Sequence, residues 1–166
     1  MKKLILLLIG LYIVSCGGNS NKNAAELWND GQKHRTEDKL KESIVSYRTI
    51  INKYPSDNFA AQAQFQIADI YLNDVKDFNF AIEEFQKVVA QYPDHEVAKK
   101  SLFMIAYIYN NYLNAYSDAI ASYNLFRQMY PNDELIPSVE YELDGLKDIQ
   151  STIDSLNFIV NKKSNI

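Results

Sequence analysis

Residues 43–55 read SIVSYRTIINKYP, residues 81–93 read AIEEFQKVVAQYP, and residues 119–131 read AIASYNLFRQMYP. Each stretch ends in Tyr-Pro, and the three recur with a 38-residue period. In each, a small residue is followed by an aromatic residue four positions later and an apolar residue seven positions later, which places all three on one stripe of a helix. Proline closes each stretch because it cannot continue a helix. The sequence therefore predicts a helical repeat array.

A partner helix is predicted in the first half of each unit, where a bulky aromatic residue precedes a very small residue by three positions. These pairs are Trp28 and Gly31, Phe65 and Ala68, and Phe103 and Ala106. The small residue lets two helices approach closely. The second and third units hold one residue more than the first between this small residue and the next helix. We expect a turn to absorb it, within residues 73–79 and 111–117.

This order of helix, turn, helix and proline resembles the tetratricopeptide repeat family, whose usual period is about 34 residues. The longer period and the aromatic-Pro end are more similar to the subfamily found in outer-membrane lipoproteins such as BamD of the β-barrel assembly machinery, and in the periplasmic protein associated with the Tol-Pal system. The resemblance covers residues 24–146. It implies an all-α solenoid of helical hairpins, with repeats at residues 24–57, 58–95 and 96–133. Such repeats serve many binding roles, so the resemblance is more specific for fold than for function.

A further helix is predicted over residues 138–160, where apolar residues recur at spacings of three and four. They are Val139, Leu143, Leu146, Ile149, Ile153, Leu156 and Val160. Asp144 and Lys147 stand where the earlier units have alanine and tyrosine. The segment is expected to cap the third repeat and to present polar residues to water, and a docking helix for a partner protein is the alternative. Residues 161–166 are expected to form a tail.

The N-terminal residues 1–15 have the pattern of an export signal, with Lys2 and Lys3 before an apolar run over residues 4–14. The run is shorter than the roughly 20 apolar residues that a membrane-spanning helix needs. It ends in Ile13, Val14, Ser15 and Cys16, which match the bacterial lipobox. The residues that follow, up to position 23, contain no apolar side chain and are expected to form a flexible tether with a span on the order of 15 Å.

Cys16 is the candidate lipid attachment site. The resemblance implies that its thiol receives a diacylglyceryl group and that it becomes the first residue of the mature protein; the alternative is an ordinary cysteine near an ordinary cleavage site. Cys16 is the only cysteine, so no disulfide can form within one chain. Gly17 follows it where an aspartate would favour retention in the inner membrane, so the expected location is the periplasmic face of the outer membrane.

The charge balance argues against two kinds of partner. Without the two lysines of the signal, 15 basic residues face 21 acidic ones, which gives a formal net charge of −6. Nucleic acid is not an expected partner, because phosphate binding needs a basic surface. Attraction to an anionic membrane surface is not expected either, so the lipid would be the anchor.

No set of residues in the sequence has the pattern of a catalytic centre. His34 and His95 have no carboxylate or cysteine at metal-ligand spacing, and the sequence has no glycine-rich phosphate loop. Glu83 and Glu84 are adjacent and are expected on a solvated helix face, because neighbouring residues on a helix point about 100° apart. The sequence predicts no enzyme, no metal and no cofactor.

The resemblance places a protein-binding groove along the first helix of each repeat. Its candidate residues are Trp28, Arg35, Phe65, Asp69, Asn73, Phe103, Tyr107, Asn110 and Asn111. They mix aromatic anchors with amide and charged groups, a composition typical of peptide sites. For the three aromatic residues at the start of each unit the alternative is packing in the core, and for the asparagine pair it is a turn signal.

The resemblance also implies the class of partner. A similarity to BamD points to a protein of the outer-membrane β-barrel assembly machinery. The alternatives are a Tol-Pal or cell-division component, and an accessory role beside a cell-wall enzyme or transporter.

Overall fold

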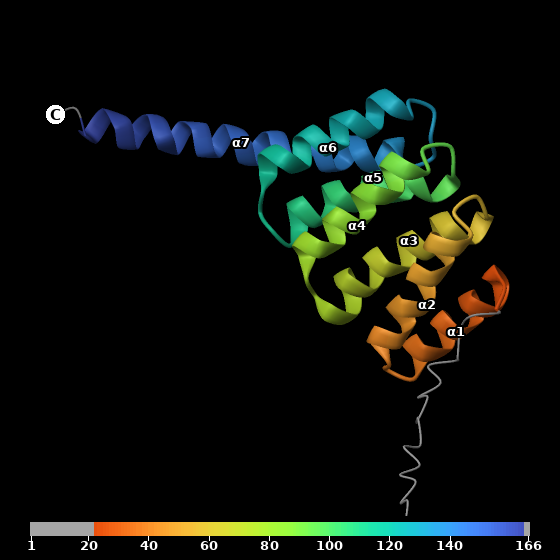
Figure 1. Ribbon diagram of the computed structural model, residues 1–166. Helices are drawn as coiled ribbons and strands as arrows, with labels where there is room; N and C mark the ends of the chain where they lie inside the picture. Colours follow the sequence, from red (N-terminus) through yellow and green to blue (C-terminus); the bar gives the residue numbers. More distant parts are fainter. Residues whose placement is uncertain (1–21, 165–166) are drawn as a thin grey trace, which may run out of the picture.

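The computed structural model describes residues 22–164, in which all regular structure is helical and no strand occurs (Figure 1). The helices are α1 (Ala24–Thr36), α2 (Leu40–Lys53), α3 (Asn58–Ile70), α4 (Phe78–Gln91), α5 (Glu96–Asn111), α6 (Tyr116–Met129) and α7 (Ile136–Ser164), with a π-helical turn, η1 (Tyr71–Val75), after α3. No helix in this range is long and apolar enough to cross a membrane. The predicted all-α solenoid is confirmed.

The helices form three stacked hairpins followed by α7, whose C-terminal part extends beyond the stack (Figure 1). We call α1, α3 and α5 the first helices and α2, α4 and α6 the second helices. Each helix packs on the next one along the chain, and α1 also contacts α3, as α3 contacts α5. The first helices therefore share one face of the array, which we call the first-helix face.

The Tyr-Pro pairs end the second helices as predicted. Tyr54, Tyr92 and Tyr130 have nearly the same backbone conformation, with φ between −132° and −129°, and each N–H donates to the carbonyl four residues earlier. Three residues later, at positions 57, 95 and 133, a side chain accepts a hydrogen bond from the backbone N–H two residues further on. Each of these hydrogen bonds satisfies a backbone N–H in the first turn of the following helix, which has no partner within that helix. One unit therefore ends and the next begins at the same position of every repeat.

The connection inside each hairpin turns at a residue with positive φ. These residues are Asp38, Lys76 and Asn114, which recur with the period of the Tyr-Pro pairs and have φ of 58°, 61° and 51°. The extra residue of the second and third units lies before this point. In the third unit a turn absorbs it as predicted, because four residues separate α5 from α6 where three separate α1 from α2. In the second unit the prediction was wrong, because the end of the first helix widens into η1, where the N–H of Lys76 donates to the carbonyl of Tyr71, five residues earlier.

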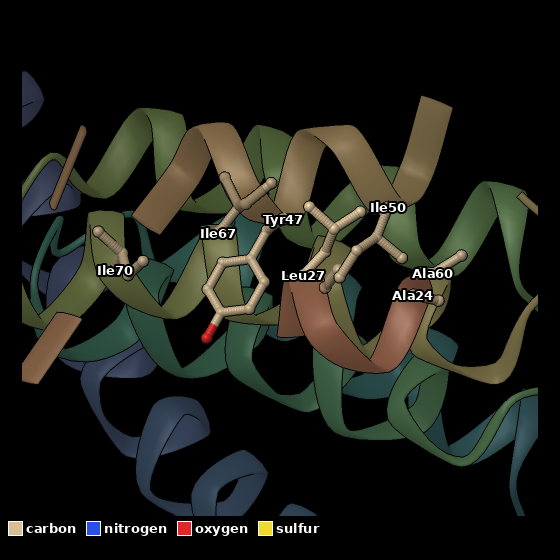
Figure 2. Packing of buried hydrophobic residues seen from close by; sticks show 8 residues of the cluster. Ala24, Leu27, Tyr47, Ile50, Ala60, Ile67 and Ile70 are labelled. Carbon is tan, nitrogen blue, oxygen red and sulfur yellow. The ribbon is translucent and has the colours of Figure 1, made fainter. Parts of the chain in front are cut away.

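The two helices of a hairpin approach most closely at the very small residue. A Cβ atom added to Gly31 would lie 2.6 Å from Cε1 of Tyr47, whose side chain is fully buried. Figure 2 shows this ring among Leu27, Ile67 and Ile70, so α1 and α3 both pack against α2 here. Ala68 is buried in one cluster with Phe85, and Ala106 in another with Tyr123.

A charged cluster crosses the junction between the first and second hairpins. Glu84 is 2% exposed, and its carboxylate accepts hydrogen bonds from Arg48 at 2.5 Å, from Lys87 at 2.7 Å and from the side-chain amide of Gln64. Glu83 is exposed, so the expectation of a solvated pair holds for Glu83 and was wrong for Glu84. Helix period alone did not reveal that Glu84 faces Arg48, because Arg48 belongs to the preceding hairpin.

The described chain begins at Lys22, so the predicted signal, Cys16 and most of the tether lie outside it. The tether was predicted to reach position 23, but its last two residues are held by the domain. Lys22 pairs with Asp30 at 2.6 Å, and its carbonyl accepts a hydrogen bond from the Tyr54 hydroxyl at 2.8 Å. Asn23 caps α1 in a reciprocal pair of hydrogen bonds with Glu26.

Helix α7 covers the end of the third hairpin. It begins two residues before the predicted start at 138 and continues four residues past the predicted end at 160, into the segment expected to be a tail. Val139, Leu143 and Leu146 are buried in the cluster formed with α5 and α6. Asp144 and Lys147 are exposed and pair with each other at 3.0 Å, as expected of a capping face. The side chains at 153, 156 and 160 lie outside the described residues.

We expect Gly31→Ala to lower the free energy of unfolding, although alanine favours a helix by about 1 kcal/mol over glycine. The added methyl group meets the ring of Tyr47, and overpacking of this kind costs about 1–3 kcal/mol. Gly145→Ala is the matched control, because a Cβ there meets nothing within 4 Å and should stabilise the protein. Urea unfolding followed by circular dichroism measures both. A Gly31→Ala protein as stable as Gly145→Ala would contradict the close approach.

The second prediction concerns acid stability. Burial acts to raise the pKa of Glu84, but the hydrogen bonds from Lys87, Arg48 and Gln64 outweigh it and lower that pKa below its ordinary value of 4.5. The ionised carboxylate therefore stabilises the fold above pH 4.5, and this contribution is lost as the pH falls through the lowered pKa.

Glu84→Gln should reduce the free energy of unfolding at pH 7 by about 1–3 kcal/mol, because buried donors lose a charged acceptor. The difference from the unmodified protein should shrink as the pH falls toward 3. Glu83→Gln, at the adjacent exposed position, is the control. Urea titrations at several pH values test this, and a difference that is constant with pH would show that the Glu84 charge does not contribute.

Candidate functional site

The aromatic residues predicted for the groove are partly buried against rings of their own hairpins, and Trp28 also packs against a ring of the next hairpin. Trp28 stacks on Phe59 and is tilted against Tyr47, with ring centroids 5.3 Å apart in both pairs. Phe65 meets Phe85 edge-on at 5.2 Å. Phe103 contacts Tyr123 and Phe126 in the same manner, at 5.7 and 6.2 Å. These contacts support the alternative that the three rings pack in the core, although each side chain remains partly exposed.

A hollow of about 270 Å³ opens on the first-helix face where all three first helices contribute. It is lined by Trp28 from α1, by Gln62, Phe65 and Gln66 from α3, and by Glu96, Val97 and Lys100 from α5. We call it the first-helix hollow. Two of the predicted groove residues, Trp28 and Phe65, therefore line one shared hollow although they are far apart in the sequence.

The predicted polar residues Arg35, Asp69 and Asn73 form a network between the first two hairpins. The guanidinium of Arg35 lies 2.6 Å from both Asp69 and Asp74, and it donates to Gln66 at 3.0 Å. Asn73 donates to Asp69 at 2.8 Å. Burial acts to lower the pKa of Arg35, but the hydrogen bonds and charges of the two carboxylates outweigh it and raise that pKa. These charges pair with each other, which makes the network a clamp between repeats.

The third predicted group, Tyr107, Asn110 and Asn111, lies near the end of α5. Asn110 donates to Glu142 of α7 at 2.8 Å, so it ties the capping helix to the third hairpin. Asn111 is exposed, and its amide donates to the carbonyl of Tyr107 at 3.0 Å within the same helix. The ring of Tyr107 meets Tyr112 edge-on at 6.0 Å. Of these residues, Tyr107 and Asn111 keep surface that a partner could contact.

A second hollow, of about 370 Å³, lies between this end of α5 and helix α7. Asn110, Tyr141 and Glu142 line it, with Leu146 and Ile149 further along α7. Tyr141 is 79% exposed, although it occupies the position of Phe65 and Phe103 in the repeat. It is exposed because no second helix packs against α7 in the described chain.

The contacts thus divide the predicted groove into an aromatic hollow, an ionic clamp and a polar end beside α7. Sequence reasoning missed Gln62 and Lys100, which lie three residues before Phe65 and Phe103 and border the first-helix hollow. Their equivalent positions in successive repeats could have revealed them, because residues one turn before the aromatic residues share the same face. It also missed Gln66 and Glu96, for which the repeat phase gives no comparable signal.

The described residues hold no group of three or more His, Cys, Asp or Glu side chains that could bind a metal ion. His95 serves as a helix cap: its Nδ1 accepts a hydrogen bond from the N–H of Val97 at 3.2 Å, and its Nε2 lies 2.9 Å from the side-chain oxygen of Asn58. The first-helix face offers a hollow with aromatic side chains in its lining, bordered by two amides and by one charge of each sign.

Two segments of the chain, residues 62–95 and 100–133, match the family model of the tetratricopeptide repeat. The first covers most of α3 and all of α4, and the second covers most of α5 and all of α6. The offset between the two segments is the same as that between successive Tyr-Pro pairs. No curated protein matches the chain.

Proposed function

We propose that this tetratricopeptide repeat protein is a non-enzymatic scaffold that binds a protein partner along its first-helix face. The observation that carries the proposal is the first-helix hollow, to which three separate helices contribute side chains. A repeat array uses such a shared face because each repeat adds one strip of surface to it.

The lining of the hollow fits an extended polypeptide. Trp28 and Phe65 offer apolar surface for one side chain of the partner, and aromatic residues in this setting are common anchors of protein interfaces. The side-chain amides of Gln62 and Gln66 can both donate to and accept from a peptide backbone. Lys100, on the opposite helix, supplies a positive charge at the edge.

We place the scaffold at the periplasmic face of the outer membrane, held by a lipid on Cys16. The lipobox pattern over residues 13–16 and the glycine after the cysteine support this placement. The contacts of Lys22 with Asp30 and Tyr54 would also limit the distance between the array and the membrane. Because Lys22 follows Cys16 so closely in the sequence, the lipid would hold the end of the array formed by α1 and α2 within a few tens of ångströms of the membrane.

Within this class we propose a role in outer-membrane β-barrel assembly, by similarity to BamD. The support is the 38-residue period and the Tyr-Pro end of each hairpin, on which the resemblance to that lipoprotein subfamily depends. A Tol-Pal, cell-division or cell-wall adaptor is the alternative within the same scaffold class, and the experiment on the partner separates the two.

The membrane anchor predicts a simple result. Cys16→Ser in the full chain removes the thiol that would carry the lipid, so the protein should move from the membrane fraction to the soluble periplasmic fraction. Fractionation followed by immunoblotting measures this, with Ser20→Ala as a control that leaves the cysteine intact. Membrane association that survives Cys16→Ser would contradict a lipid anchor at this residue.

The partner is tested by photo-cross-linking in the native envelope, with a photoreactive amino acid in place of Lys100. The matched control carries it in place of the exposed Lys41 on α2, which does not line the first-helix hollow. We expect a specific adduct at position 100 only, and we expect Gln62→Ala to reduce its yield while the thermal unfolding temperature stays within about 2 °C.

The identity of the cross-linked protein decides between the roles. The barrel-forming assembly protein, together with lower porin levels on depletion of the scaffold, is the expected result. Recovery of Pal or a cell-wall enzyme, with normal porins and defective septation, would replace the barrel-assembly role by envelope maintenance. Equal adducts at positions 41 and 100 would contradict a site on the first-helix face.

A further inference from the structure

The two junctions between hairpins can be compared residue by residue, because each position in the second junction has an equivalent one repeat earlier in the first. The first junction, between α2 and α4 over α3, is filled by the charged cluster of Arg48, Gln64, Glu84 and Lys87. Arg48 reaches from α2 to Glu84 of α4, whose carboxylate Lys87 and Gln64 also contact, so polar side chains occupy this junction.

At the second junction, between α4 and α6 over α5, every member of this cluster is replaced. Gln86 stands in the place of Arg48, Leu102 in that of Gln64, Ser122 in that of Glu84 and Leu125 in that of Lys87. The replacements are shorter or apolar, and no ion pair joins α4 to α6 among the described side chains. The space therefore stays open as a hollow of about 290 Å³, which we call the second-helix hollow.

An aromatic ring is also replaced at this junction. In the first junction Phe80 stacks on Tyr71, with ring centroids 5.4 Å apart. The equivalent of Tyr71 is Tyr109, which lines the second-helix hollow, and the equivalent of Phe80 is Asp118. No ring among the described side chains stacks on Tyr109, so its side in the hollow lacks the cover that Phe80 gives to Tyr71.

Asp118 adds a charge to the rim of this hollow. It is exposed, lies in the first turn of α6, and forms no ion pair with the described residues. The rest of the lining is mainly apolar, from Val89, Ala90, Ile105, Ala121 and Leu125, and Leu125 is 43% exposed. The hollow therefore combines an uncovered aromatic ring, apolar walls and one carboxylate without a cationic partner.

We propose that the second-helix hollow receives an aromatic side chain of a partner polypeptide, and that a basic residue next to it in the partner pairs with Asp118. The first junction supplies the template, because there Phe80 covers Tyr71 and the cation of Arg48 crosses the gap to a carboxylate. The volume is near the lower end for ligand pockets, which fits one large side chain rather than a whole small molecule. The proposal rests on the scaffold function and adds a second contact surface, on the side of the second helices.

The test uses the chain from residue 16 onward with Cys16→Ser, labelled with ¹⁵N, and blocked tetrapeptides as probes. The sequence Gly-Phe-Arg-Gly should shift the amide signals around the second-helix hollow in a saturable manner at millimolar concentration. Gly-Ala-Arg-Gly should bind about tenfold more weakly or worse, because it lacks the ring. Gly-Phe-Glu-Gly should bind several-fold more weakly, because its charge has the same sign as Asp118.

Asp118→Phe is the decisive variant, since it restores inside the chain the ring that Phe80 supplies in the first junction. It should fold, with an unchanged or higher unfolding temperature, and should lose peptide binding. Ser117→Phe, the matched control, adds the same ring at the neighbouring position and should still bind the peptide. If Asp118→Phe fails to fold, Leu125→Ala, which removes part of the apolar wall at an exposed position, should instead weaken binding of Gly-Phe-Arg-Gly.

Three results would overturn the proposal. They are equal binding of the phenylalanine and alanine peptides, retention of binding by Asp118→Phe, and saturable shifts at this hollow with a dodecyl-chain detergent but with no peptide. These outcomes are independent of the scaffold proposal, which is tested by cross-linking at Lys100 on the first-helix face. A normal adduct there with no peptide bound at the second-helix hollow would refute only the present inference.

Discussion

The contact on which the array depends is the one between an aromatic ring of each second helix and a very small residue of its first helix. At Gly31 the ring of Tyr47 occupies the space of a missing Cβ, and alanine fills the same position in the other two hairpins. The ring is phenylalanine in the second hairpin, so the contact depends on the ring and not on a hydroxyl group. With the two helices held this close, the core of each hairpin continues onto the first helix of the next unit, where Ile67 and Ile70 of α3 join the cluster of Tyr47.

The hairpin contact also determines where the repeats can differ. The residues that pack a hairpin are nearly constant, whereas those between hairpins are not. One junction is closed by Arg48 and Lys87 on a buried Glu84, and the equivalent junction is open, with Leu125 and Ser122 among the replacements. A buried ion pair adds little net stability compared with apolar packing, so the exchange changes the surface that each junction presents without threatening the fold.

The first-helix face has the same division between packing and surface. Trp28, Phe65 and Phe103 each pack against other rings in the core, and the first two also border a hollow shared by three helices. Interpretations of such residues as core or as site are therefore not exclusive. Arg35 and Asp69, by contrast, neutralise each other across two repeats, and their role is to hold neighbouring first helices together.

Much of the fold was predictable from the sequence. The repeat period, the Tyr-Pro pairs and the stripe of apolar residues predicted the helices and their ends, because these features depend on residues within a few turns of one another. The aromatic part of the candidate site followed from the same phase. The period did not show how an extra residue is accommodated before Lys76, because a π-turn and a longer loop have the same sequence spacing.

The tertiary structure alone decided which polar residues meet across repeats. The burial of Glu84 and the pairing of Arg35 with two carboxylates join side chains from different hairpins, and the open space beside Asp118 reflects the absence of a neighbour. A single sequence gives each residue its face on a helix. It does not give the distance between faces, and that distance determines whether a charge is paired, a ring is covered or a hollow stays open.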